Sequence, residues 1–113
     1  ATLAERVDDY VVYDTDGLVR GCGALHRFGD DAEIAGLAVD DRVEHLGIGR
    51  RIVEYLIAAG REQQFARLFV LTTQASDWFE KLGFVPAPVE QLPVERKRTY
   101  DPLRKSRVLM LTL

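Results

Sequence analysis

The alternation of apolar and polar positions predicts strands in the first third of the chain. Residues 10–13 and 18–28 are rich in β-branched and aromatic side chains, and an Asp-Gly turn lies between them. Another turn at residues 29–31 leads into the apolar stretch 32–40. Short strands separated by tight turns pair with their neighbours, so the pattern predicts an antiparallel meander over residues 10–40.

The period changes at Gly47, after which apolar residues recur at spacings of three and four. They are Ile48, Ile52, Tyr55, Leu56 and Ala59, and charged residues occupy the opposite face. This pattern is typical of an amphipathic helix, and Gly60 is a candidate for its end. The near-continuous apolar run 67–73 predicts a buried strand. A helix between two strands makes a crossover connection, so strands 32–40 and 67–73 are expected to be parallel.

The remaining segments predict shorter elements. Residues 75–82 indicate a short helix, residues 84–93 an extended stretch punctuated by prolines, and residues 107–113 a closing strand. Residues 3–9 suggest the end of an amphipathic helix. The expected fold class is α/β (α+β), with a mixed, mostly antiparallel sheet, one parallel splayed pair and flanking helices.

Composition narrows the class of protein. A chain of 113 residues with 47% hydrophobic residues suggests one domain over residues 1–113. The net charge of −3 argues against a nucleic-acid partner. Cys22 is the single cysteine, so no internal disulfide is possible, which favours a reducing compartment. No apolar run approaches the ~18 residues of a membrane span, and we expect a cytoplasmic protein without a membrane partner.

Charge is unevenly distributed along the chain. From Glu90 to the end there are six basic residues against three acidic ones, so this segment is basic while the rest is acidic. A basic segment on an acidic body suggests a small anionic ligand, although a solvated charged face explains it equally well. His26 and His45 stand alone without the spacing of metal ligands, and we expect no metal.

Two glycines introduce the long helix. Gly47 and Gly49 allow a backbone to approach a ligand closely, and the unpaired N–H groups of a first helical turn favour phosphate. Arg50 and Arg51 add positive charge, whereas Glu44 places a negative charge in front of the glycines. The stretch is neither a Walker loop nor a three-glycine dinucleotide motif, and a tight strand-to-helix turn that binds nothing is the alternative.

Further polar residues stand at positions where they could act on a substrate. Glu33 interrupts an apolar strand, and a carboxylate there could serve as a general base or could point to solvent. Arg104 and Ser106 lead into the last strand, where an arginine could grip a carboxylate through two hydrogen bonds and a serine could add a third.

The glycine stretch resembles the coenzyme A loop of the GCN5-related N-acetyltransferases (GNAT). Glu44-His45-Leu46-Gly47-Ile48-Gly49 matches the loop pattern (Gln/Arg)-x-x-Gly-x-(Gly/Ala) at both glycines and departs from it at Glu44. Phe79-Glu80-Lys81-Leu82-Gly83-Phe84 resembles a second segment of the family, an aromatic residue followed by x-x-x-Gly-Phe. The splay between strands 32–40 and 67–73 would correspond to the family's V-shaped opening.

The resemblance is closer to one branch, the acetyltransferase domain of N-acetylglutamate synthase, and runs over almost the whole chain. The stretches that carry it are "LFVLTTQASDWFEKLGFVPAPVEQLP" and "YDPLRKSRVLM". The family normally has a first strand and one or two helices before "LAERVDDYVVYD", so we expect the N-terminal part of the fold to be missing. The branch also uses an upstream arginine for its substrate.

The resemblance implies acetyl-CoA as co-substrate and assigns roles to residues of this chain. Glu33 would be the general base, and a hydroxyl of Thr72, or less favourably Thr73, would assist the departing sulfur. Satisfaction of free backbone groups at the strand end also explains a threonine there. Arg104 and Ser106 would hold the glutamate substrate. The coenzyme A site would comprise Leu37, Ala38, Val39, His45, Leu46, Gly47, Ile48, Gly49 and Arg50.

These observations leave three functions open. The first is transfer of acetyl from acetyl-CoA to the α-amino group of an amino acid, most favourably L-glutamate, for arginine synthesis. The second is the same chemistry on another small amine or amino acid. The third is a non-catalytic domain that binds coenzyme A or regulates a partner. An unfilled sheet edge would favour a homodimer or a partner chain that completes the sheet.

Overall fold

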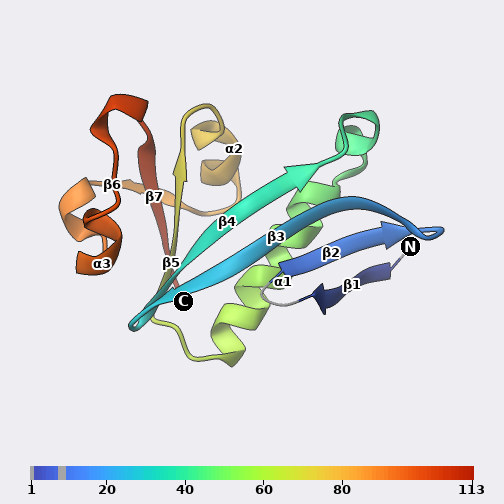
Figure 1. The fold of residues 1–113 in the computed structure, drawn as a ribbon, viewed down its shortest axis with the longest axis horizontal. Coiled ribbons are helices and arrows are strands. Elements are labelled where there is room, and N and C mark those ends of the chain that lie inside the picture. Colours follow the sequence, from blue (N-terminus) through green and yellow to red (C-terminus); the bar gives the residue numbers. More distant parts are fainter. Residues whose placement is uncertain (1, 8–9) are drawn as a thin grey trace.

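A seven-stranded mixed sheet organises the molecule, with strand order β1-β2-β3-β4-β5-β7-β6 (Figure 1). The computed structural model describes residues 2–7 and 10–113, and side chains from Tyr10 onward. The strands are β1 (Thr2–Val7), β2 (Tyr10–Thr15), β3 (Leu18–Phe28), β4 (Asp31–Val39), β5 (Arg67–Thr72), β6 (Val85–Ala87) and β7 (Arg107–Thr112). The α-helices are α1 (Ile48–Glu62), α2 (Ser76–Lys81) and α3 (Val94–Lys97), and the 3₁₀ helices are η1 (Asp41–Leu46), η2 (Val89–Gln91) and η3 (Pro102–Arg104). None of the helices in the described ranges has the length and apolar character to cross a membrane.

The predicted meander is confirmed, and it contains one irregularity that matters for the site. β2, β3 and β4 pair in antiparallel fashion, but the register shifts between the pairs Cys22↔Ala38 and Ala24↔Ala35. Two residues of β4 therefore lie opposite one residue of β3, which is a β-bulge. Gly36 adopts φ +62° in this bulge, a conformation that other residues rarely take.

The predicted parallel pair is confirmed as well, and it is short. β4 pairs with β5 at Asp31↔Arg67, Ala32↔Leu68 and Glu33↔Phe69. Beyond these positions the two strands diverge, as Figure 1 shows. An ion pair between Arg67 and Asp31 (Nη2–Oδ2 2.8 Å) closes the narrow end of this splay. The opening between β4 and β5 is therefore fixed at one end and wide at the other.

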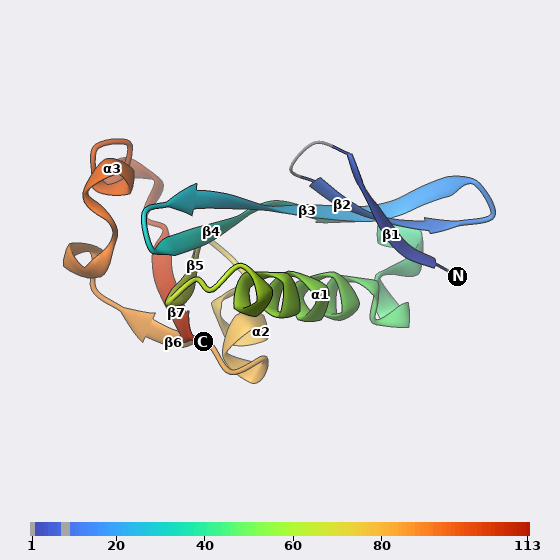
Figure 2. The same cartoon turned by 90° about the horizontal axis from the view of Figure 1, so that it is seen from below.

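Two groups of apolar side chains cover the two faces of the sheet. α1 and α2 lie on one face (Figure 2), where Ile52, Val53 and Leu56 of α1 are fully buried. Each such side chain contributes about 1.5–3 kcal/mol by burial, so α1 is firmly anchored to the sheet. On the other side, Phe69 and Leu92 belong to a smaller cluster under the segment that carries α3. This segment is thereby held over β5 and β7.

The prediction of a helix over residues 3–9 is wrong. Residues 2–7 form β1, which pairs antiparallel with β2, and residues 8–9 lie outside the described part of the chain. The exposed edge of β2 offers backbone hydrogen-bond partners that a periodicity argument over seven residues does not see. The structure also adds β6, which the prolines had marked only as extended; Pro86 is tolerated because β6 is the edge strand. α1 continues through Gly60 to Glu62.

Candidate active site

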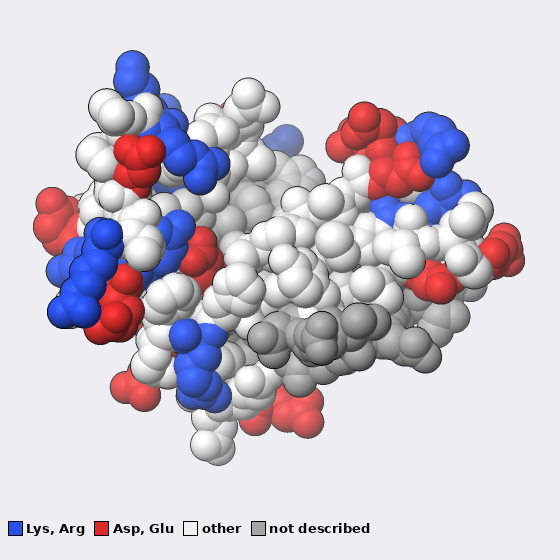
Figure 3. Space-filling view, in the orientation of Figure 1, with Lys and Arg blue, Asp and Glu red and all other residues white. Residues whose placement is uncertain are grey.

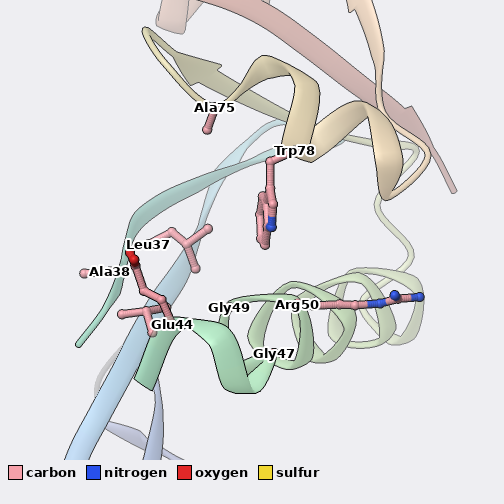
Figure 4. A pocket seen from close by; sticks show the side chains of 9 residues that line it. Leu37, Ala38, Glu44, Gly47, Gly49, Arg50, Ala75 and Trp78 are labelled. Carbon is pink, nitrogen blue, oxygen red and sulfur yellow. The ribbon is translucent and has the colours of Figure 1, made fainter. Parts of the chain in front are cut away.

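Two cavities meet where β4 and β5 diverge. The first, of about 430 Å³, lies between the end of β4, the start of α1 and α2, and we call it the glycine-turn groove (Figure 4). Its lining includes six of the residues that were expected to bind coenzyme A: Leu37, Ala38, Val39, Gly47, Gly49 and Arg50. The second, of about 340 Å³, lies between β4, β5 and the α3–η3 segment, and we call it the splay pocket. Leu37 and Ala75 line both cavities, so the two are contiguous.

Asp40 fixes the start of η1, the turn that precedes Gly47. It caps η1 by accepting a hydrogen bond from the Arg42 backbone N–H (3.0 Å), and it forms ion pairs with Arg42 (2.9 Å) and Arg20 (3.1 Å). The Arg42 side chain is the main reason that the pKa of the Asp40 carboxyl is held well below its usual range, and the Arg42 backbone N–H adds to this effect. Because Arg20 belongs to β3, these contacts tie the turn before Gly47 to the sheet.

Gly47 forms the junction between η1 and α1. It adopts φ +75°, and a Cβ built on it would meet no atom within 4 Å, so open space lies in front of this turn. The first intrahelical hydrogen bond runs from Arg51 N to Gly47 O (3.2 Å), which leaves the N–H groups of residues 48–50 at the helix start. A glycine turn with open space before a 15-residue helix is a suitable place for a phosphate group.

The charges around the groove differ from the expectation. The Arg50 side chain points along α1 and away from the groove (Figure 4), and it pairs with Glu54 (3.4 Å). Arg51 donates a hydrogen bond to the Tyr13 hydroxyl (3.3 Å) and lies over the Tyr13 ring. Glu44 does line the groove. Backbone dipoles, rather than the two arginines, therefore provide the positive character of this turn.

The other loop residues of the expected site do not line the groove. His45 and Leu46 are exposed on η1, and the Ile48 side chain is buried in the core at 3% exposure. The packing of Ile48 follows from its place on the apolar face of α1. Ile48 can therefore contribute to a ligand site only through its backbone.

Trp78 is a groove residue that the sequence did not indicate. Its neighbour Phe79 is buried in the core at 3% exposure, whereas Trp78 is 36% exposed and lines the groove. A Cβ on Gly49 would lie 3.3 Å from the Trp78 ring, so the glycine allows the indole to pack against the start of α1. Adjacent residues of a helix point about 100° apart, a signal that could have separated the two.

Glu33 lies in the splay pocket and is not directed to solvent. Its side chain is 12% exposed and is held by Arg96, which donates from Nε to Oε1 (2.7 Å) and from Nη2 to Oε2 (3.4 Å). Arg96 lies on α3 and also donates to Thr99 Oγ1 (2.8 Å). The sequence had shown Arg96 only as part of a basic stretch, because the 63 positions that separate it from Glu33 conceal the contact.

Thr72 lies in the splay pocket, beside the junction of the two cavities. Its Oγ1 accepts hydrogen bonds from the N–H groups of Ala75 (2.9 Å) and Gln74 (3.4 Å), which satisfies the turn into α2. A hydroxyl that accepts can still donate its own hydrogen, so the proton of Thr72 remains available for a further contact. Thr73 is exposed and does not line either cavity.

The two residues expected to bind a substrate carboxylate are separated. Arg104, at the end of η3, lines the splay pocket together with Glu33 and Thr72. Ser106 does not line it; its backbone oxygen accepts a hydrogen bond from the Tyr100 hydroxyl (3.4 Å). The pocket therefore combines a carboxylate, a hydroxyl and two guanidinium groups from four separate segments of the chain.

Comparisons with known proteins identify the family to which this splayed sheet belongs. The family model described as "Acetyltransferase (GNAT) domain" matches residues 7–86. The chain belongs to the GNAT acetyltransferase family.

Relatives within this family point to one branch. The chain is 37% identical to an amino-acid acetyltransferase from Aeromonas salmonicida, over 98% of this chain and 26% of the relative. It is 39% identical to an amino-acid acetyltransferase from Ralstonia nicotianae, over 98% of this chain and 25% of the relative. The chain thus spans about a quarter of the length of these proteins.

Solved structures give the same picture. N-acetylglutamate synthase from Neisseria gonorrhoeae, complexed with coenzyme A and N-acetyl-glutamate, superposes with a TM-score of 0.89 at 30% identity. The match covers 98% of this chain and 29% of the synthase chain. The Rv2747 protein from Mycobacterium tuberculosis, in complex with CoA, superposes with a TM-score of 0.78 at 29% identity, over 93% of this chain and 76% of that one.

Proposed function

We propose that residues 1–113 form an acetyltransferase domain that moves acetyl from acetyl-CoA to the α-amino group of an amino acid, with L-glutamate as the preferred acceptor. One observation carries the proposal. A groove suited to coenzyme A and a charged pocket suited to an amino acid share the lining residues Leu37 and Ala75, so the two cavities adjoin at the splay of β4 and β5. As the resemblance to the synthases implies, the acetylated product would feed arginine synthesis.

The glycine-turn groove fits coenzyme A in shape and chemistry. The open space before Gly47 and the N–H groups at the start of α1 suit its pyrophosphate. The apolar walls formed by Leu37, Val39 and Trp78 suit its pantetheine arm. Because these contacts are backbone dipoles and apolar surface, they hold the co-substrate without a metal.

The residues at the splay supply the remaining chemistry. Bound acetyl-CoA provides the acetyl group as a thioester. Glu33 takes a proton from the substrate ammonium, directly or through a water, so that the amine nitrogen can form a bond to the carbonyl carbon. The β4 bulge at Gly36 and Leu37 frees a backbone N–H from the ladder to stabilise the carbonyl oxygen. As the carbon–sulfur bond breaks, the Thr72 hydroxyl donates a hydrogen bond to the departing thiolate, and the proton that the new amide nitrogen releases converts this thiolate to the thiol of coenzyme A.

Arg104 is the residue of this chain that we assign to the substrate carboxylate. It is a cation of the splay pocket whose guanidinium is exposed, so a ligand can reach it. A guanidinium binds a carboxylate through two parallel hydrogen bonds, which fixes orientation as well as position. Ser106 would join it only if the segment after η3 shifted toward the pocket.

The proposal is tested by measuring acetyl-CoA turnover with L-glutamate, L-aspartate and L-glutamine as acceptors. We expect the highest kcat/KM with glutamate and a lower value with glutamine, which lacks the second carboxylate. Turnover that is best with a substrate lacking any carboxylate would overturn the choice of acceptor. Calorimetry gives the further control: coenzyme A binding without turnover of any amine would identify a non-catalytic binding domain instead.

A further inference from the structure

The proposed base, Glu33, forms an ion pair with Arg96. Both carboxylate oxygens of Glu33 accept from Arg96, and the two side chains are only 12% and 17% exposed. An amine substrate must reach the same carboxylate to give up its proton. The pair therefore competes directly with the reaction assigned to Glu33.

The charges of the splay pocket suggest how this competition is resolved. Among the described residues that line it, the charged ones are Glu33, Arg96 and Arg104. An amino acid with a second carboxylate brings one ammonium and two carboxylates. The two sets match one for one, with a carboxylate for each arginine and the ammonium for Glu33.

We infer that Arg96 exchanges partners when an acidic amino acid binds: it leaves Glu33 for a substrate carboxylate, and Glu33 is freed to take the ammonium proton. This inference rests on the proposed function and adds to it a control on when the base becomes available. Arg104 binds the second carboxylate. The chemical class selected in this way is an α-amino acid with two carboxylates.

The physical reason is the cost of an unpaired charge in a shielded site. Removing one member of a buried ion pair leaves a charge without compensation, which is strongly unfavourable. In the exchange every charge keeps a partner, because the substrate carboxylate replaces Glu33 as the partner of Arg96. A neutral amino acid has only one carboxylate, so one of the two arginines remains without a new partner, or the base remains tied to Arg96. The second carboxylate of the substrate then accounts both for the preference for acidic amino acids and for the release of Glu33 from Arg96.

The neighbours of Glu33 on the surrounding elements show which other charges lie near it. His26 of β3 lies directly opposite Glu33 in the sheet register, Arg96 faces it from α3, and Arg104 lines the pocket from η3. From β5, Phe69 is the register partner and carries no charge.

The test compares Arg96→Gln, Arg96→Lys and the control Arg98→Gln. Arg98 directly follows α3, pairs with Glu95 (3.2 Å) and is 69% exposed, so its loss leaves the pocket intact. For Arg96→Gln we expect the KM for L-glutamate to rise about 10- to 100-fold while the KM for acetyl-CoA stays unchanged, since a hydrogen-bonded charge pair is lost. The loss in kcat/KM should be much smaller with L-glutamine. Arg96→Lys should restore part of the binding.

A crystal structure of the wild-type chain with coenzyme A and N-acetyl-L-glutamate supplies a readout that does not depend on how the variants fold. The inference expects Arg96 on a ligand carboxylate, with its Nε farther than about 4 Å from Glu33 Oε1. An intact Arg96–Glu33 pair beside the bound ligand overturns the exchange and leaves the proposed function standing. If Arg96→Gln lowered kcat/KM equally with glutamate and glutamine and left KM unchanged, Arg96 would only position Glu33 and would not bind the substrate. Absence of wild-type turnover with every amino acid would overturn the proposed function, and the inference with it.

Discussion

The glycine-turn groove and the splay pocket adjoin, yet they are built in different ways. The groove takes most of its lining from residues 37–50, one continuous stretch that ends β4 and begins α1. The splay pocket takes its charged and hydroxyl groups from β4, β5, α3 and η3. The groove presents mainly backbone and apolar surface, whereas the pocket presents side-chain charge. A local stretch therefore prepares the co-substrate site, and long-range packing assembles the acceptor site.

The charged side chains on the surface are also distributed unevenly between the two ends of the molecule. Figure 3 shows Lys and Arg side chains gathering over the end of the molecule that carries α3, interspersed with acidic ones. The smooth white area in the middle of this face separates them from a second charged cluster near η1. The basic C-terminal segment is thus concentrated on the acceptor side of the molecule.

Removing the charge of Glu33 should abolish most of the turnover that depends on the splay pocket and leave coenzyme A binding in the glycine-turn groove unchanged. For Glu33→Gln we expect kcat with L-glutamate to fall about 10²- to 10⁴-fold near neutral pH, because the amide cannot accept the proton. The affinity for coenzyme A, measured by calorimetry, should stay the same. Glu95→Gln, which alters an exposed carboxylate on α3, is the matched control. Full turnover by Glu33→Gln would rule out Glu33 as the base.

A methyl group on Gly47 should have the opposite effect: it should weaken coenzyme A binding and leave amino-acid binding unchanged. Gly47→Ala should weaken coenzyme A about tenfold, because its Cβ would occupy the open space in front of the turn, while the KM for the amino acid stays within about twofold. The backbone at φ +75° should also cost about 1–2 kcal/mol of stability.

Gly29→Ala provides the matched control for that substitution. Gly29 has φ +65°, equally open surroundings and a place in the β3–β4 turn, away from both cavities. It should lose similar stability in thermal unfolding and keep its affinity for coenzyme A. An equal weakening of coenzyme A in both variants would trace the effect to stability rather than to the groove.

Thr72 lines the splay pocket and accepts a hydrogen bond from Ala75, which lines both cavities, so its substitution should affect turnover and stability. Thr72→Val removes the donor to the sulfur and the acceptor of the Ala75 N–H, and we expect kcat to fall about five- to tenfold with a stability loss of about 1 kcal/mol. Thr72→Ser keeps the hydroxyl and should retain most of the turnover. If Thr73→Val, at an exposed neighbouring position, lost more activity than Thr72→Val, the assignment would pass to Thr73.

The smallest expected effect concerns Glu44, whose carboxylate lines the groove. Glu44→Arg should tighten coenzyme A about two- to fivefold at low salt, since a repulsive charge near a helix N-terminus is replaced by an attractive one. The gain should shrink as ionic strength rises. Weaker binding by Glu44→Arg would assign Glu44 a structural role in η1.

Much of the fold could be predicted because the signals are local. The alternation in residues 10–40 and the helical period after Gly47 depend on side chains within a few positions of each other, and both elements formed as expected. The strand at Thr2–Val7 was missed because its stability comes from pairing with β2, which no seven-residue window contains. The place of Trp78 in the groove could not be predicted because α2, at six residues, is too short for its pattern to define a buried face.

The sequence by itself determined the glycine turn, the parallel crossover and a carboxylate at the splay, since each is encoded by neighbouring residues with a fixed conformational preference. Only the tertiary structure decided how the charges are used. It turned Arg50 and Arg51 away from the groove and brought Arg96 onto Glu33 across 63 positions. Chain proximity governs backbone conformation, but charges pair with whatever partner the packed fold brings within a few ångströms.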